Sequence, residues 1–163
     1  MNNSLIMGGT GMLQEASRWL IARSDSTLLV ARGANRMDFG SGTVSALDAD
    51  WNRPDFEARV RAALAEIPEI STALLWLHDP EPILTWLVPL LPGAQIVVVL
   101  GSTDGRPEQL RHLAHVDFVQ LGSVEEGGRR RWLTHAEISA GAISALNNRK
   151  SVVVGQLVGL SGR

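Results

Sequence analysis

The sequence predicts an α/β fold, a doubly wound and mostly parallel sheet of about seven strands with helices on both faces. Two observations support this prediction. Short apolar runs alternate with amphipathic stretches along the 163 residues, and such an alternation is typical of parallel strands joined by crossover helices. Several of the apolar runs are continuous rather than alternating, which indicates strands that are buried on both faces.

Seven apolar runs are predicted to form the strands, and they lie at residues 4–7, 27–31, 43–47, 73–77, 95–100, 117–121 and 151–158. The interval between the second and third runs is short and broken by glycines, so we expect no full crossover helix over residues 32–42. The segment 125–131, "EEGGRRR", is predicted to be a polar turn or loop. The chain shows no repeats and no long linker, so we expect one domain over residues 1–163.

Helical spacing of apolar residues predicts helices over residues 11–23, 54–67, 81–91 and 135–147, and residues 107–114 could form a short fifth one. Pro54 falls in the first turn of the second helix, where a missing N–H group costs little. Thr134 and Glu137 have the spacing of a capping box, which marks the start of the last helix.

The helix predicted over residues 81–91 is apolar on most of its sides and contains Trp86. A helix of this kind is either buried or in contact with another subunit. We therefore expect a homodimer that forms through this helix. The other tryptophans are also expected mostly in the core or at an interface, and they are Trp19, Trp51, Trp76 and Trp132.

Composition excludes some classes of function. The formal net charge of -2 argues against a general binder of nucleic acid or of membrane surfaces. No apolar run approaches the roughly 20 residues that a membrane-spanning helix needs, and no signal peptide is recognisable. The chain contains no cysteine, so it forms no disulfide, and we expect it in the cytoplasm.

The junction between the first strand and the first helix, "SLIMGGTGMLQ", carries the glycines Gly8, Gly9 and Gly11. Glycines allow a sharp turn and a close approach of the backbone to a pyrophosphate, and N–H groups at the start of a helix attract anions. Two glycine frames of dinucleotide-binding turns fit, each with Gln14 in place of its last glycine. The sequence therefore predicts dinucleotide binding, with a tight turn that binds no ligand as the alternative. Because the last glycine normally permits close packing of helix on strand, Gln14 is expected to push the helix outward.

Two arginines near the end of the second strand favour NADP(H) over NAD(H). Sites for NAD usually place Asp or Glu there to accept the ribose hydroxyls, whereas this strand ends at Arg32, and Arg36 follows one turn later. A guanidinium binds a 2′-phosphate bidentately, although a solvated surface charge is an equal alternative for Arg36. Asp48 and Asp50 end the third strand near the expected adenine, and Asp50 or Asn52 could instead cap the next helix.

The segments "LIMGGTGMLQ", "LLVARGANRM", "LDADWNRPDF" and "VVVLGSTDGRP" resemble, in order and spacing, the short-chain dehydrogenases/reductases, in particular their atypical, shortened members. The resemblance implies a Rossmann sheet in the strand order 3-2-1-4-5-6-7, with the nucleotide over the carboxyl ends of the strands. It also implies contacts of Arg32 with the 2′-phosphate and of Asp50 with the adenine. The residues that it places around the pyrophosphate are Gly8, Gly9, Thr10, Gly11, Met12 and Leu13.

The usual chemistry of this family does not carry over, because its Tyr-x-x-x-Lys pair is impossible in a chain without tyrosine. His78, at the end of the fourth strand, is the best candidate for a general acid because histidine titrates near neutral pH. The alternative for His78 is a local hydrogen bond at the end of its strand. Ser102, after the fifth strand, resembles the family's serine, and the same rim is expected to hold Asp79, Thr103 and Asp104.

Three further groups of residues are candidates for a site. Trp132 could stack over a nicotinamide or close a pocket, and His135 could reach it. The alternative is that this stretch only caps and packs its helix. His112 and His115 are three residues apart, but no third ligand has suitable spacing, so no metal site is expected. The arginines at positions 129–131 are expected in a solvated loop, with an acidic partner or a phosphate as the alternative.

Three hypotheses for the function follow. The first is an NADP(H)-binding oxidoreductase that acts on a small-molecule substrate without the usual tyrosine. The second is a non-catalytic dinucleotide-binding module that senses redox state or regulates a partner. The third is an interaction scaffold that binds no nucleotide. Its basis is Gln14, which replaces the last glycine of the dinucleotide-binding turn.

Overall fold

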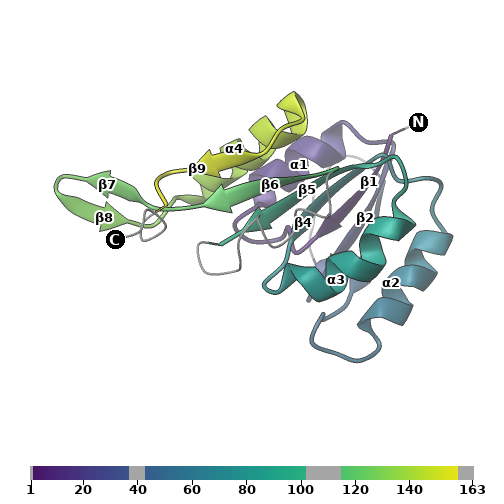
Figure 1. The fold of residues 1–163 in the computed structure, drawn as a ribbon. Helices are drawn as coiled ribbons and strands as arrows, with labels where there is room; N and C mark the ends of the chain where they lie inside the picture. The colour runs from purple at the N-terminus through teal and green to yellow at the C-terminus, as the bar shows by residue number, and fades with distance from the viewer. Residues whose placement is uncertain (1, 37–42, 102–114, 158–163) are drawn as a thin grey trace.

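The computed structural model describes residues 2–36, 43–101 and 115–157 (Figure 1). Seven strands form one sheet in the order β3-β2-β1-β4-β5-β6-β9, and every neighbouring pair is parallel. Both the predicted fold class and the predicted strand order are confirmed. The strands are β1 (Asn3–Met7), β2 (Ser26–Ala31), β3 (Val44–Asp48), β4 (Thr72–Trp76), β5 (Gln95–Leu100), β6 (Val116–Leu121) and β9 (Val152–Val154).

Helices cover both faces of this sheet (Figure 1). The helices α1 (Gln14–Ala22) and α4 (His135–Asn148) lie on one face, and α2 (Phe56–Ala65) and α3 (Pro80–Leu87) lie on the other. Side chains of β1 alternate between them, since Leu5 and Met7 pack toward α2 and α3 while Ile6 packs toward α1 and α4. Burial on both faces explains why the strands are continuous apolar runs in the sequence.

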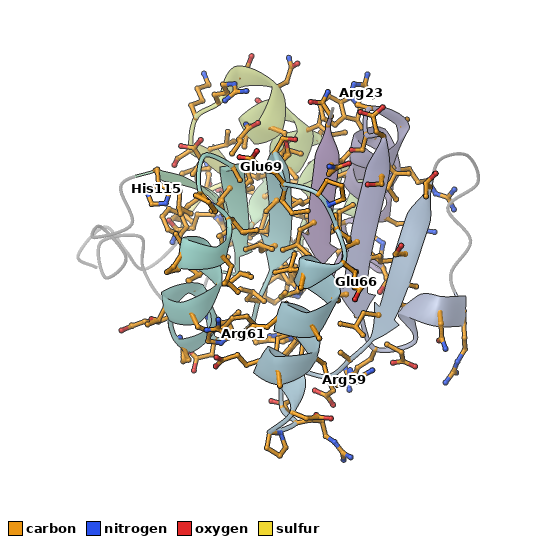
Figure 2. All side chains as sticks on the ribbon, turned by 90° about the vertical axis from the view of Figure 1, so that its right-hand side faces the viewer. Arg23, Arg59, Arg61, Glu66, Glu69 and His115 are labelled. Atoms are coloured by element: carbon orange, nitrogen blue, oxygen red, sulfur yellow. The ribbon has the colours of Figure 1, made fainter. Side chains whose placement is uncertain are left out.

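Helix α2 shows the expected division into a buried and a charged side. Phe56 and Val60 are buried against the sheet, whereas Arg59, Arg61 and Glu66 are exposed on its outer surface (Figure 2). This is the pattern of a helix that covers a sheet and faces solvent. Within the three described stretches, no helix combines the length and the apolar character that crossing a bilayer requires.

Helix α1 begins later than predicted, because the glycine turn extends up to the helix. Gln14, its first residue, donates its backbone N–H to Gly11 O at 3.0 Å. Helix α4 packs against this start, where the Ser139 hydroxyl accepts from Ala16 N (3.2 Å) and donates to Met12 O (3.3 Å). The fold thus fixes the amino end of α1 through hydrogen bonds within the protein.

The segment 125–131 forms an antiparallel hairpin of β7 (Val124–Glu126) and β8 (Arg129–Arg131), which extends away from the main sheet (Figure 1). Gly127 and Gly128 connect the two strands with φ of 62° and 78°. Two successive left-handed residues make a tight hairpin turn that glycine adopts without strain. The predicted turn is confirmed at Gly127 and Gly128, whereas the two short strands that flank it were not predicted.

Other boundaries differ in smaller ways. Strand β9 ends at Val154, earlier than predicted, because Gly155 follows with φ of 75°. The helix predicted over 81–91 consists of α3 and a 3-10 turn, η2 (Val88–Leu90). In the interval between β2 and β3, the described residues form one 3-10 turn, η1 (Ala34–Arg36). Residues 37–42, the rest of this interval, lie outside the described residues. The short helix predicted over 107–114 also lies outside them.

Candidate functional site

The glycine turn after β1 lies at the carboxyl edge of the sheet, where the chain order reverses between β1 and β4. Gly8 has φ of 74°, and a Cβ on it would lie 2.6 Å from Trp76 O. A Cβ on Gly9 would lie 2.5 Å from Ile6 Cγ2 and would also meet the Ser17 hydroxyl. These two glycines are therefore required by packing within the protein.

Gly11 differs from the other two glycines of the turn. Apart from its two neighbours in the chain, no atom of the described residues lies within 4 Å of the position that its Cβ would take. Packing of the described protein atoms therefore does not require a glycine at this position. The missing side chain leaves the backbone open to solvent beside the amino end of α1, which is where an anion would be attracted.

Gln14 stands where dinucleotide-binding turns carry their last glycine, and its expected effect was to push α1 outward. The helix nevertheless lies close to the turn, because the Ser17 hydroxyl donates to Gly9 O at 2.7 Å. Gln14 is half-buried and lines neither of the two cavities described below. The structure thus shows close helix–turn packing and a site that the Gln14 side chain does not fill.

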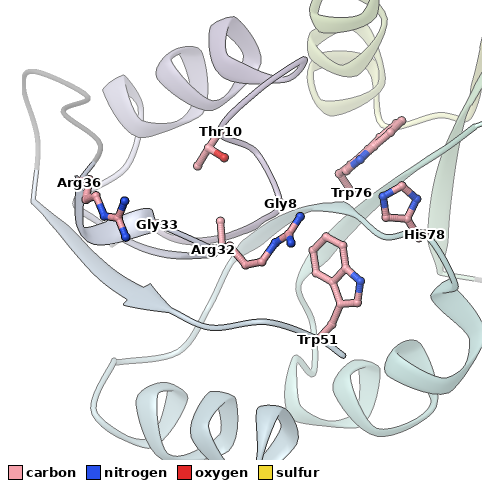
Figure 3. A pocket seen from close by; sticks show the side chains of 9 residues that line it. Gly8, Thr10, Arg32, Gly33, Arg36, Trp51, Trp76 and His78 are labelled. Carbon is pink, nitrogen blue, oxygen red and sulfur yellow. The ribbon is translucent and has the colours of Figure 1, made fainter. Parts of the chain in front are cut away.

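A polar cavity of about 480 Å³ opens at this turn (Figure 3). We call it the cationic cavity, because the described residues that line it include two arginines and no carboxylate. It brings together five of the residues that the sequence indicated from three separate segments. The residues that line it are Gly8, Thr10, Ala31, Arg32, Gly33, Arg36, Trp51, Trp76 and His78.

The two arginines reach the cavity from the segment after β2. The Asp48 carboxylate accepts from Gly33 N at 2.8 Å, and Arg36 N donates to Gly33 O at 3.0 Å, so this segment is fixed by its own hydrogen bonds. Arg32 and Arg36 are both exposed. Among the described residues, neither guanidinium forms an ion pair with a carboxylate. Two positive charges are therefore presented to an anionic ligand.

Aromatic rings form the other end of the cationic cavity, away from Arg36 (Figure 3). His78 is exposed, and its ring centroid lies 5.7 Å from that of Trp51 and 6.4 Å from that of Trp76. Trp51 and Trp76 were expected in the core or at an interface, and their place in the cavity was missed. The signal that could have found them is their position, because each stands at or just after the carboxyl end of a strand.

Asp50 does not line the cationic cavity. Its carboxylate accepts from Asn52 N at 2.9 Å, and Arg53 N donates to its backbone oxygen at 3.0 Å. Helix α2 begins at Phe56 without a side-chain cap, so the expectation that Asp50 or Asn52 caps this helix was wrong. A contact of Asp50 with adenine stays a prediction.

A second cavity, of about 220 Å³, lies on the β5 and β6 side of the glycine turn. We call it the apolar cavity, because hydrophobic side chains form most of its lining. Trp132, which is 80% exposed, stands at its edge, as one of the sequence hypotheses expected. The residues that line it are Met12, Trp76, Gly101, Leu121, Gly122, Trp132, Leu133 and Ile138.

Several other candidates do not meet at these cavities. Leu13 is buried, His135 is exposed, and neither lines a cavity, nor do Gly9 and Gly11. In the part of the chain that the structure describes, no three His, Asp or Glu side chains lie together as a metal site. Four candidates lie outside the described residues, and they are Ser102, Thr103, Asp104 and His112.

The predicted capping box at the start of α4 is confirmed. Glu137 N donates to Thr134 Oγ1 at 3.1 Å, and Thr134 N donates to Glu137 Oε1 at 2.8 Å. Arg131 donates to both carboxylate oxygens of Glu137, at 2.8 and 3.3 Å, and to Glu126 Oε2 at 2.7 Å. The prediction of a merely solvated Arg131 was therefore wrong.

These hydrogen bonds change the titration of Glu137. Donation from Arg131, and then from the Thr134 backbone, lowers the pKa of Glu137 from 4.5 to about 2. In turn, the hydrogen bond to the Glu137 carboxylate raises the pKa of Arg131, and the hydrogen bond to Glu126 is the next largest cause. The network fixes the hairpin of β7 and β8 to the first turn of α4, next to Trp132.

No family model matches the sequence, and no curated protein matches it. Solved structures do match. A short-chain dehydrogenase from Sphingobium yanoikuyae in complex with NADPH has 16% sequence identity and a TM-score of 0.68, over 100% of this chain and 91% of that chain. A bulky-bulky ketone specific alcohol dehydrogenase from Comamonas testosteroni has 13% identity and a TM-score of 0.69, over 99% of this chain and 89% of that chain.

An NADH-dependent reductase, A1-R′, complexed with NAD, has 10% identity and a TM-score of 0.65, over 94% of each chain. The similarity therefore extends over nearly the whole sheet and its helices. The resemblance to short-chain dehydrogenases/reductases is confirmed at the level of the fold, since this chain has the same Rossmann-like architecture.

Proposed function

We propose that this chain is an NADP(H)-binding protein of atypical short-chain dehydrogenase type. The observation that carries the proposal is the cationic cavity at the reversal of strand order, which joins the glycine turn to two arginines without carboxylate partners among the described residues. In open α/β sheets, ligands bind at this point of the carboxyl edge. Of the similar structures, one is a complex with NADPH and another is a complex with NAD.

The residues present fit the two ends of such a cofactor. Arg32 and Arg36 provide bidentate donors for a 2′-phosphate, and Trp51 provides ring surface for a base. Gly11, whose Cβ position is open, allows a pyrophosphate to approach the N–H groups at the start of α1. The apolar cavity on the other side of the turn suits a planar ring.

Titration with NADPH and NADH, followed by quenching of tryptophan fluorescence, tests this proposal. Trp51 and Trp76 line the cationic cavity, so bound nucleotide changes their emission. We expect NADPH to bind more tightly than NADH, because the second cofactor lacks the phosphate that the arginines would bind. Equal and weak binding of the two would contradict the assignment of Arg32 and Arg36.

An oxidoreductase acting on a small-molecule substrate is the first form of this function. When bound, the cofactor supplies a hydride, and the protein has to supply a proton donor. His78 is exposed at the rim and is the acid that we propose for this role. We expect His78→Ala to abolish turnover in a screen of small carbonyl compounds while NADPH binding persists.

A non-catalytic sensor or regulatory module is the second form, and one observation favours it. His78 lines the cationic cavity and not the apolar one, and no described residue around the apolar cavity is an acid or a base. A nicotinamide in the apolar cavity would therefore meet no proton donor from the described chain. NADPH binding without oxidation of NADPH by any compound in the screen supports the sensor.

A further inference from the structure

Trp76 stands where the two cavities meet. It is the last residue of β4, the strand that lies between β1 and β5 at the centre of the sheet. Among the described residues, Trp76 alone lines both the cationic and the apolar cavity. A ligand that extends from one cavity into the other must therefore pass this side chain.

The Trp76 indole is held by neighbours on several sides. It is half-buried and packs against the side chains between the sheet and the helices α1 and α4. The Cβ position of Gly8 lies 3.3 Å from Trp76 Cβ and 3.4 Å from Trp76 Cδ1, so the glycine turn packs directly on the side chain. The His78 ring contacts it edge to face, at an angle of 70°. Moving the indole therefore costs packing contacts.

The two cavities differ in the chemistry that they accept. In the cationic cavity Arg36 lies at the end away from the aromatic rings, and the Arg32 side chain extends toward Trp51 (Figure 3). Cationic donors beside aromatic rings suit a phosphorylated nucleoside. The apolar cavity has less than half the volume of the cationic one, 220 against 480 Å³. With the nicotinamide in the apolar cavity, the complete dinucleotide would occupy both cavities, whereas a nucleoside phosphate would occupy the first one alone.

We propose that Trp76 is a specificity-determining residue, which separates the two cavities and makes the chain favour the adenosine 2′-phosphate end of the cofactor over the whole dinucleotide. This inference rests on the proposed binding of NADP(H). The complete cofactor binds only when the indole moves from its place between Gly8 and His78. A smaller residue at position 76 joins the cavities and removes that cost.

Calorimetric titration with adenosine 2′,5′-bisphosphate and with NADPH tests this role on the wild-type chain, on Trp76→Ala and on Trp51→Ala. The bisphosphate needs the cationic cavity alone, so the ratio of its dissociation constant to that of NADPH measures the barrier between the cavities. We expect Trp76→Ala to shift this ratio about tenfold in favour of NADPH, which corresponds to about 1.4 kcal/mol. Trp51→Ala is the matched control, because Trp51 lines the cationic cavity and not the apolar one. It should weaken the binding of both ligands and leave the ratio unchanged.

An unchanged ratio in Trp76→Ala, or a shift toward the bisphosphate, would overturn the role of Trp76. Continued binding of the bisphosphate in that case leaves the proposed function standing. Failure of both ligands to bind the wild-type chain would overturn the proposed function together with this inference. Thermal unfolding reports whether Trp76→Ala folds. If it does not fold, Trp76→Leu takes its place in the titration, because leucine keeps an apolar side chain in the core.

Discussion

Individual residues of the glycine turn have different reasons to be glycine. Gly8 has a left-handed backbone and lies against Trp76, and Gly9 lies against Ile6 and Ser17. Beyond its chain neighbours, a Cβ on Gly11 would meet no atom of the described residues. One motif in the sequence therefore contains two glycines that the fold needs and one that the described packing does not require.

Gly8→Ala and Gly11→Ala separate these two reasons. We expect Gly8→Ala to lower the free energy of unfolding by about 2 kcal/mol or more, because the Cβ would be strained by φ and would collide with a backbone oxygen. Gly11→Ala should change it by less than about 0.5 kcal/mol and should weaken NADPH binding. Urea denaturation and calorimetry measure the two effects. A Gly11→Ala chain that binds NADPH like the wild type would contradict the role of Gly11 in binding.

Under the proposed function, Arg32 and Arg36 are expected to decide between the two nicotinamide cofactors. We expect Arg32→Ala to weaken NADPH about tenfold, because a charge-assisted hydrogen bond contributes about 1.5 kcal/mol or more. NADH should be affected far less, since it carries no 2′-phosphate. Arg59→Ala is the matched control, because Arg59 is exposed on α2 and lines neither cavity. An equal loss for both nucleotides would show that Arg32 contacts a part that they share.

At the scale of elements, the hairpin of β7 and β8 is joined to the first turn of α4 by charge. Arg131 bridges Glu126 and Glu137, and Glu137 also completes the capping box with Thr134. Trp132 follows the hairpin directly and lies at the edge of the apolar cavity. The attachment of the hairpin to α4 therefore depends on the Glu137 carboxylate.

The contribution of Glu137 to stability should depend on pH. Its pKa in the folded chain is about 2, below the ordinary value of 4.5, so the unfolded chain binds the proton more readily. The stabilisation is fully present above pH 4.5 and is lost as the pH falls toward about 2. We expect Glu137→Gln to be less stable than the wild type near neutral pH, and the difference to shrink in acid.

Urea denaturation at several pH values measures this difference. Thr134→Ala is the control, because it removes the cap but not the carboxylate and should cost about 1 kcal/mol with a weaker dependence on pH. A Glu137→Gln difference that stays constant down to acid pH would show that the ion pair with Arg131 contributes nothing measurable.

Most elements could be predicted from the sequence, because the parallel sheet is buried on both faces and its strands are continuous apolar runs. Strand β5 was predicted at its observed boundaries, residues 95–100. The hairpin could not be predicted as a hairpin, since its strands carry charged residues and no apolar pattern. Its stability comes from the glycine turn and from pairing of Glu125 and Glu126 with Arg130 and Arg129 across the strands.

At the scale of the whole molecule, the expected homodimer through α3 stays a prediction. Trp86 packs edge to face on Phe56 of α2, with ring centroids 6.1 Å apart, so part of the apolar surface of α3 is already covered within the chain. Glu81 and Thr85 are exposed on the same helix. Light scattering at micromolar concentration should give the mass of a dimer, and a monomeric mass would contradict the prediction.

The sequence by itself determined the class of fold, and its resemblance to a known family implied the order of strands. It also indicated the glycine turn and the arginines that line the cationic cavity. Apolar periodicity records which surfaces are buried, and the glycine turn and Arg32 are local features of the chain. Tertiary structure alone decided that Trp51, Trp76 and His78 share a cavity and that Trp76 stands between two cavities. Which side chains meet depends on the twist and order of strands far apart in the chain, and no local pattern contains that information.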